Sequence, residues 1–199
     1  MAQDNLLPNG GFEDWAQTSS ISANAFRLDH REAPAYWLAN MPLEATPGSD
    51  EAKPLLIRDA EIKHGGELSA RVEIPDPTIL GSLAIRPEAS SAWAPAPVQI
   101  EPGKNYLVRG WLRGEGVASN EKGEIVVMHV IVGGADDFFG GANNNRHLTH
   151  KVEWQDGSDW FPFEFEFQSK DSEVAMFFSI SFHGSGKFWI DDLEVVQAP

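Results

Sequence analysis

The chain has 199 residues, a length that many all-β domains reach undivided, so we expect a single domain over residues 1–199. Thirty acidic side chains against fifteen basic ones give a formal net charge of −15, which argues against nucleic acid and anionic membranes as partners. The absence of cysteine excludes disulfides, thiolate metal sites and a cysteine nucleophile. No apolar run approaches the ~20 residues of a membrane-spanning helix, so we expect no membrane insertion.

The first quarter of the chain has little regular pattern. Residues 5–15, NLLPNGGFEDW, contain Pro8 and a Gly10–Gly11 pair, which predict a bent or bulged entry into a sheet. Residues 16–54 are rich in Ala, Ser and Pro, with one short apolar run, PAYWL, at 34–38. We expect long loops over 16–54, with at most one helical turn.

The remaining residues alternate between apolar and polar side chains, the pattern of half-buried strands. Strands are predicted over residues 55–62, 68–74, 80–86, 97–101, 105–113, 124–132, 148–154, 161–168, 173–183 and 187–196. Glycine and proline turn signals separate them. Many short strands with such turns predict an all-β fold, a two-sheet antiparallel β-sandwich.

Alternation also assigns side chains to faces. Within 173–183 the face of Val174, Met176, Phe178, Ile180 and Phe182 is expected in the core, with Phe177, Ser179, Ser181 and His183 opposite. Within 105–113 the polar and aromatic face consists of Arg109, Trp111 and Arg113. Within 124–132, His129 shares a face with Val127 and Ile131.

Five blocks in one order carry a family resemblance: NLLPNGGFE at 5–13, HGGELSARVEI at 64–74, VQIEPGKNYLVRGWLRGEG at 98–116, WFPFEFEF at 160–167 and KFWIDDLEVV at 187–196. In this respect the chain resembles the galactose-binding-domain-like jelly roll of carbohydrate-binding modules of the family 4, 9 and 22 type. The blocks span nearly the whole chain. The resemblance implies a jelly-roll sandwich, a carbohydrate ligand and a secreted, periplasmic or cell-surface location.

The resemblance also implies a structural calcium ion where the first and last strands meet. Carried onto this sequence, its side-chain ligands would be Glu13 and Asp191, with carbonyl oxygens near Asn9 to Gly11 and near Lys63 to Gly66. Calcium takes six to eight oxygen ligands of these kinds. The alternative is that both carboxylates only accept hydrogen bonds from turn amides.

Sugar recognition needs a flat apolar surface for the ring and planar polar groups for its hydroxyls. The candidate ligand-binding residues are therefore Arg109, Trp111, Arg113, His129, Phe177, Ser179 and His183, which we expect on one sheet face, together with Phe138, Phe139, Asn144 and Arg146 of a lid-like loop at 133–147. Simpler roles remain open for several of them. Trp111 would pack under a loop, Arg109 and Arg113 would pair with surface acids, His129 would sit at the core edge, and Phe138 and Phe139 would anchor their loop.

These observations predict non-catalytic binding of a poly- or oligosaccharide, within a larger glycan-handling system of other domains or subunits. One alternative is a polysaccharide-active enzyme. It would be a lyase with His129 or His183 as base and Arg109 or Arg113 neutralising a uronate carboxylate, or a hydrolase, for which the nearest acidic pair is Asp136 and Asp137 of the loop. Another is a cell-surface protein-interaction module. The sequence contains no lipase-type elbow, zincin motif, phosphate loop or dinucleotide fingerprint, which favours a binder over an enzyme.

Overall fold

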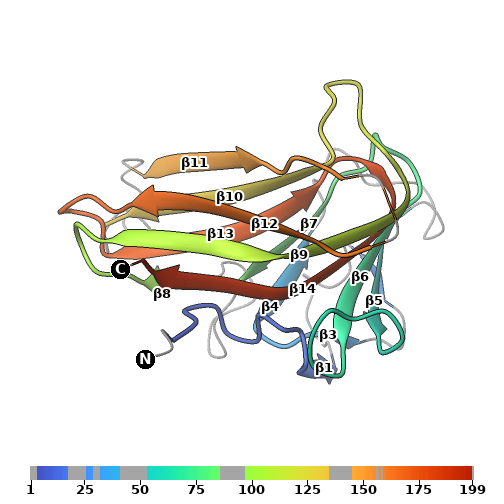
Figure 1. The fold of residues 1–199 in the computed structure, drawn as a ribbon, viewed down its shortest axis with the longest axis horizontal. Helices are drawn as coiled ribbons and strands as arrows, with labels where there is room; N and C mark the ends of the chain where they lie inside the picture. Colours follow the sequence, from blue (N-terminus) through green and yellow to red (C-terminus); the bar gives the residue numbers. More distant parts are fainter. Residues whose placement is uncertain are drawn as a thin grey trace.

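The computed structural model describes residues 4–17, 26–28, 32–40, 53–85, 97–134, 145–155, 157 and 159–198. Most of these residues form two six-stranded sheets that pack face to face, as Figure 1 shows. No described segment forms a helix long and apolar enough to span a membrane. The all-β sandwich predicted from alternation is therefore confirmed.

The first sheet, here the β9 sheet, has the order β12-β9-β14-β6-β5-β2. Its strands are β12 (Phe161–Gln168), β9 (Asn105–Ala118), β14 (Ser185–Gln197), β6 (Ser69–Ile74), β5 (Leu55–Asp59) and β2 (Arg27–Leu28). All pairs are antiparallel except β2–β5, which is parallel and so departs from the purely antiparallel expectation.

The second sheet, here the β10 sheet, has the order β11-β10-β13-β7-β4, with β8 also pairing with β13. Its strands are β11 (Arg146–Lys151), β10 (Val126–Gly133), β13 (Ala175–Phe182), β7 (Gly81–Ile85), β4 (Trp37–Asn40) and β8 (Val98–Gln99). A separate ribbon pairs β1 (Trp15–Gln17) with β3 (Glu32–Pro34).

The expectation of loops over residues 16–54 is wrong where the structure describes them, because β1, β2, β3 and β4 lie there. These strands have two to four residues, too few for alternation to show. The β4 strand completes an edge of the β10 sheet, and its Trp37 is fully buried in the core.

The core lies between the two sheets and follows the predicted faces. From β13 it receives Met176, Phe178, Ile180 and Phe182, and from β9 it receives Tyr106, Val108 and Leu112. The opposite side chains of each strand therefore point out of the sandwich, on two separate outer faces.

The two ends of the chain meet, as predicted. Residues 5–10 run beside β14, the dark blue and dark red ribbons of Figure 1. The Leu6 amide donates to the Val195 carbonyl at 2.8 Å, and the Leu193 amide donates to the Gly10 carbonyl at 2.9 Å. The Asn5 side chain adds bonds to the same segment of β14, donating to the Leu193 carbonyl and accepting from the Val195 amide.

Candidate functional site

The outer face of the β10 sheet carries two rows of polar and small side chains, set by strand register. One row runs Thr149, His129, Ser179, Ala84 and Leu38 across five strands. The next runs Lys151, Val127, Ser181, Ser82 and Asn40. In the row beyond His129, Ile131 lies between His147 and Phe177. Hydroxyls, an imidazole and apolar side chains thus alternate over one surface.

The part of this face on β10 and β13 is sheltered from solvent although it points away from the core, whereas His147, Thr149 and Lys151 of β11 are exposed. Val127 is 3% exposed and Ser181 is 7% exposed. His129, Phe177 and Ser179 are half-buried. On the outer face of the β9 sheet Arg109, Glu164 and Glu166 are exposed, whereas Trp189 and Asp191 of β14 are buried. Polar groups on the sheltered face compete less with water, so hydrogen bonds made there are stronger.

The charged groups at one end of this face form a small cluster. Lys151 Nζ lies 2.7 Å from Glu124 Oε1, and His183 Nδ1 lies 3.6 Å from Glu124 Oε2. The bond from Lys151 is the main reason that the pKa of Glu124 is lowered. The Nε2 atom of His183 is buried and has no hydrogen-bond partner. The cluster therefore leaves one imidazole nitrogen unused.

Burial favours the neutral form of two histidines of the face, His129 and His183. Burial lowers the pKa of His129, and the nearby His147 lowers it further. Burial also lowers the pKa of His183, against the opposing effect of Glu124. A neutral imidazole offers one donor and one acceptor, as a hydroxyl does. With Thr149 and Ser179, the face can both donate to and accept from an uncharged polyhydroxyl ligand.

The predicted ligand-binding residues do not share one face. His129, Phe177, Ser179 and His183 lie together on the β10 sheet, but Arg109, Trp111 and Arg113 lie on the outer face of the β9 sheet. The expectation that both groups share a sheet is therefore wrong. Alternation gives the face of a strand within its own sheet, but it does not assign the strand to a sheet.

The three β9 side chains have different surroundings. Arg109 Nη2 lies 2.6 Å from Glu194 Oε2, so it pairs with a surface acid. The Trp111 ring stacks on the His64 ring with centroids 3.8 Å apart. The Arg113 guanidinium lies over the Trp189 ring, 5.6 Å from its centroid.

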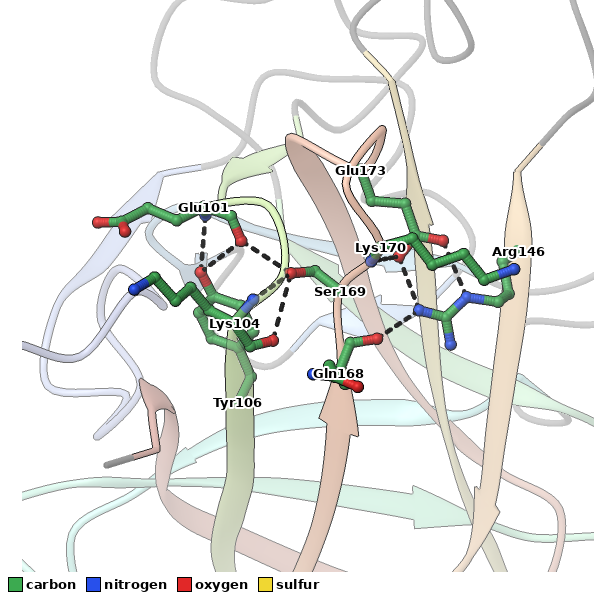
Figure 2. Close-up of polar contacts among 8 residues, drawn as sticks. All are labelled: Glu101, Lys104, Tyr106, Arg146, Gln168, Ser169, Lys170 and Glu173. Carbon is green, nitrogen blue, oxygen red and sulfur yellow. Dashed lines mark hydrogen bonds and ion pairs between the residues drawn. The ribbon is translucent and has the colours of Figure 1, made fainter.

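Arg146 lies on β11 but does not reach the outer face. As Figure 2 shows, its guanidinium forms a bidentate pair with Glu173, with bonds of 2.8 Å and 2.7 Å, and donates to the Gln168 carbonyl. Glu173 is buried, so this pair has a structural role between β11 and the β12–β13 turn. The predicted loop residues Phe138, Phe139 and Asn144, and the acids Asp136 and Asp137, lie outside the described residues.

Glu13 and Asp191 both bind the turn at residues 64–68. The Asp191 carboxylate accepts the amides of His64 at 2.8 Å and Gly65 at 3.1 Å. The Glu13 carboxylate accepts the Glu67 amide at 3.0 Å and 3.1 Å. Asp191 is fully buried, and this burial raises its pKa to about 6 against the effect of its hydrogen bonds.

A β-bulge brings a further carboxylate to the same turn. Between Asp191 and Glu194 the pairing of β14 with β9 shifts register, and Asp192 adopts a positive φ of 47°. Asp192 Oδ2 then lies 2.7 Å from His64 Nδ1. Strict alternation would have put Asp192 on the opposite side from Asp191. Among the described residues, no three His, Asp or Glu side chains converge closely enough to hold a metal ion as they stand.

Sequence reasoning did not single out Thr149, Lys151 or Glu124. Thr149 and Lys151 belong to the run RHLTHK of β11, whose burial alternates residue by residue. The strand predicted at 148–154 puts Thr149 and Lys151 on one face, but the run RHLTHK has a single apolar residue and so no pattern that tells which face points outward. Glu124 precedes β10, and only the folded chain brings it to Lys151.

No protein-family model and no curated protein matches this sequence. Solved structures do match. A family 61 carbohydrate-binding module in complex with β-1,4-galactotriose has a TM-score of 0.51 and 16% identity over 98% of this chain and 99% of that one. The enzymatically active domain of tailspike protein 4 of bacteriophage CBA120 has a TM-score of 0.59 and 10% identity, over 98% of this chain and 21% of that one.

A Clostridium thermocellum xylanase fragment with family 22 binding and family 10 catalytic modules, complexed with xylohexaose, has a TM-score of 0.50 and 10% identity. It covers 81% of this chain, which spans only 26% of its length. At these identities the likeness establishes the fold alone. The chain has the β-sandwich fold of carbohydrate-binding modules, as the sequence resemblance predicted.

Proposed function

We propose that this protein binds a poly- or oligosaccharide on the outer face of the β10 sheet, without catalysis. The observation that carries the proposal is the row of His129, Ser179 and Thr149, which presents neutral donors and acceptors on a sheet face, half-buried at His129 and Ser179 and exposed at Thr149. The fold shared with a solved carbohydrate-binding module supports the same conclusion.

The face provides both kinds of contact that a sugar ring needs. Phe177 and Ile131, paired across β13 and β10, offer apolar surface to the C–H side of a ring. Ser179 lies two residues from Phe177 on β13, and His129 lies two residues from Ile131 on β10. Both offer hydrogen bonds to the hydroxyls of the sugar. Since Lys151, the lysine in the described rows of this face, is already paired with Glu124, the face favours an uncharged glycan.

Affinity electrophoresis through gels containing soluble neutral polysaccharides tests the proposal. We expect retardation by at least one glycan, and its loss in His129→Ala and in Ser179→Val. Arg109→Ala is the matched control, because Arg109 lies on the opposite sheet in an ion pair with Glu194. Equal retardation of wild type and His129→Ala would contradict the assignment of the face. No retardation by any glycan would favour a protein-interaction module.

A lyase is the second candidate, and the unpartnered Nε2 atom of His183 favours it. A neutral histidine can act as a general base toward a proton beside a uronate carboxylate. Such a reaction also needs a cation to neutralise that carboxylate. Two described lysines act on His183, Lys122 and Lys151, and Glu124 already holds Lys151. Formation of unsaturated uronate products, measured by their ultraviolet absorbance, would establish a lyase and contradict the proposal of non-catalytic binding.

We also propose that a structural calcium ion binds between Glu13 and Asp191. The donor set is suitable in kind, since carboxylate oxygens from both chain ends meet at one turn, and carboxylates are ligands that calcium prefers. Asp191 is completely buried without a cation in contact, so a bound divalent ion would offset the cost of burying its charge. The bonds to backbone amides occupy only part of the acceptor capacity of each carboxylate.

Thermal unfolding with and without calcium tests this second proposal. An ion that binds only the folded state raises the unfolding temperature as its concentration increases. We expect a rise with Ca²⁺ that exceeds the rise with Mg²⁺, is reversed by chelation and is lost in Glu13→Gln. An unfolding temperature unaffected by Ca²⁺ would mean that both carboxylates serve only as acceptors for the turn amides.

A further inference from the structure

Arg113 is half-buried and, among the described residues, has no carboxylate partner. The other half-buried arginines, Arg71 and Arg146, each pair with a carboxylate. Six arginines are described, and four of them contact a carboxylate: Arg58, Arg71, Arg109 and Arg146. The chain has twice as many acidic as basic residues, yet no carboxylate contacts Arg113 among the described residues. Its Nε atom is buried and has no hydrogen-bond partner in the described part of the chain. A desolvated guanidinium N–H without an acceptor is costly and requires an explanation.

The guanidinium of Arg113 is held on a rigid surface. It lies 5.6 Å from the centroid of the Trp189 ring, and Arg71 lies 5.9 Å from the same ring. The Trp189 ring is fixed in turn, because its Nε1 donates to Asp59 Oδ2 at 2.9 Å. Asp59 also accepts from Arg71 at 2.8 Å. Arg113 is therefore positioned before any ligand arrives, which lowers the entropic cost of binding one.

Indole rings flank Arg113 on the same outer face. Trp111 is two residues before it on β9, with its ring stacked on His64. Trp160 comes directly before β12, whose first residue Phe161 pairs with Leu112, so extending this register by one residue puts Trp160 opposite Arg113. The rings of Trp160 and His64 meet edge to face at 5.8 Å. Both indoles are half-buried and keep part of their surface accessible.

We propose that Arg113, Trp111 and Trp160, here the Arg113 site, bind the carboxylate-bearing ring of a uronic-acid glycan. A guanidinium fork matches a carboxylate in a bidentate pair, and indole surface suits the C–H face of a pyranose. The site lies on the outer face of the β9 sheet, opposite the face proposed for neutral glycans, and does not depend on it. The protein would thus have two sites that recognise differently charged sugars.

The net charge of −15 repels polyanions at long range, so a short probe at moderate salt is appropriate. At about 0.15 M salt the Debye length is about 8 Å, so distant charges are largely screened. The probes are a galacturonate trisaccharide and its carboxyl-reduced counterpart, measured by isothermal titration calorimetry. We expect wild type to bind the acidic trisaccharide more tightly than the reduced one.

Arg113→Gln keeps a planar polar side chain and removes the charge, and we expect it to weaken binding of the acidic trisaccharide about tenfold or more. Arg113→Lys retains the charge without the fork and should also weaken binding. Arg109→Gln is the control on the same strand face and should bind as wild type does. Thermal unfolding of each variant checks that the fold is intact.

A His129→Ala variant separates this proposal from the one for the β10 sheet, because it should retain binding of the acidic trisaccharide in full. Equal affinity of Arg113→Gln and wild type would overturn the Arg113 site, as would equal affinity for the acidic and reduced probes. Binding of a glutamate-rich peptide with no binding of the uronate probe would also overturn it, in favour of a protein partner.

Discussion

His129 and His183 make the stability of the protein depend on pH. Both have a pKa below the ordinary value of 6.5, mainly because burial disfavours the imidazolium form. As the pH falls below about 6.5, the unfolded chain takes up protons on these side chains before the folded chain does. Unfolding is therefore favoured at lower pH, and the contribution of these histidines to stability is lost as the pH falls.

We expect His129→Gln to show a smaller loss of stability than wild type between about pH 7.5 and pH 5.5. Denaturant unfolding at a series of pH values measures this difference. The comparison with wild type is needed because protonation of Asp191 changes the stability with pH in the opposite direction. Its pKa is raised from 3.8 to about 6, so it adds stability as the pH falls through that range. Identical pH profiles for the two proteins would contradict the burial of His129 in its neutral form.

Gly66 is required where Glu13 meets the turn at residues 64–68. It has a positive φ of 54°, and an added Cβ would overlap the Glu13 carboxylate. Gly123 has a similar φ of 71°, but nothing lies within 4 Å of an added Cβ there. Both substitutions by alanine incur the backbone cost of a left-handed conformation, about 1–2 kcal/mol.

We therefore expect Gly66→Ala to lower the free energy of unfolding by more than Gly123→Ala does. The difference between the two losses of unfolding free energy measures the displacement of the Glu13 carboxylate from its amide partners. Chemical denaturation of the two variants provides the comparison. If both lose the same stability, the Glu13 carboxylate is not held against this turn in solution.

At the level of elements, a polar network joins the β8–β9 and β12–β13 connections. Figure 2 shows Ser169 at its centre, donating to the Glu101 carbonyl at 2.7 Å and accepting the Lys104 amide at 3.0 Å. The Tyr106 hydroxyl accepts the Glu101 amide at 2.7 Å. At its other end the bidentate pair of Arg146 and Glu173 ties β11 to the β12–β13 turn.

We expect Arg146→Ala to lower the free energy of unfolding by about 3–5 kcal/mol, because it leaves the buried Glu173 carboxylate without its counterion. The double variant Arg146→Met with Glu173→Leu should recover part of this loss. Arg109→Ala, which breaks an exposed pair, should cost about 1 kcal/mol or less. Equal losses in Arg146→Ala and Arg109→Ala would show that the Arg146 pair is solvated.

The elements that could be predicted from the sequence are those with enough residues to alternate. The predicted strand at 161–168 has the bounds observed for β12, and the face of Phe177 and Ser179 points outward as expected. The two-residue strand β2 has no pattern to detect. Sheet membership also could not be predicted, because alternation in β9 is the same whichever sheet contains it. The predicted ligand-binding face therefore combined Arg113 with His129, although these two residues lie on opposite outer faces of the sandwich.

On the scale of the whole molecule, the pairing of the chain ends makes the sandwich one cooperative unit. Residues 5–10 bond to β14, which lies between β9 and β6 in the middle of its sheet. We expect a single unfolding transition in calorimetry, with equal calorimetric and van't Hoff enthalpies. Two resolved transitions would contradict a single domain over residues 1–199.

The two outer faces of the sandwich carry different side chains, and we propose that the neutral ligand binds the face of the β10 sheet. NMR titration of isotopically labelled protein with a neutral oligosaccharide that retards it in affinity electrophoresis tests this assignment most directly. We predict chemical-shift changes concentrated at His129, Thr149, Phe177 and Ser179, with Arg109 and Glu164 unaffected. Changes confined to the β9 sheet on saturation with the same oligosaccharide would contradict it.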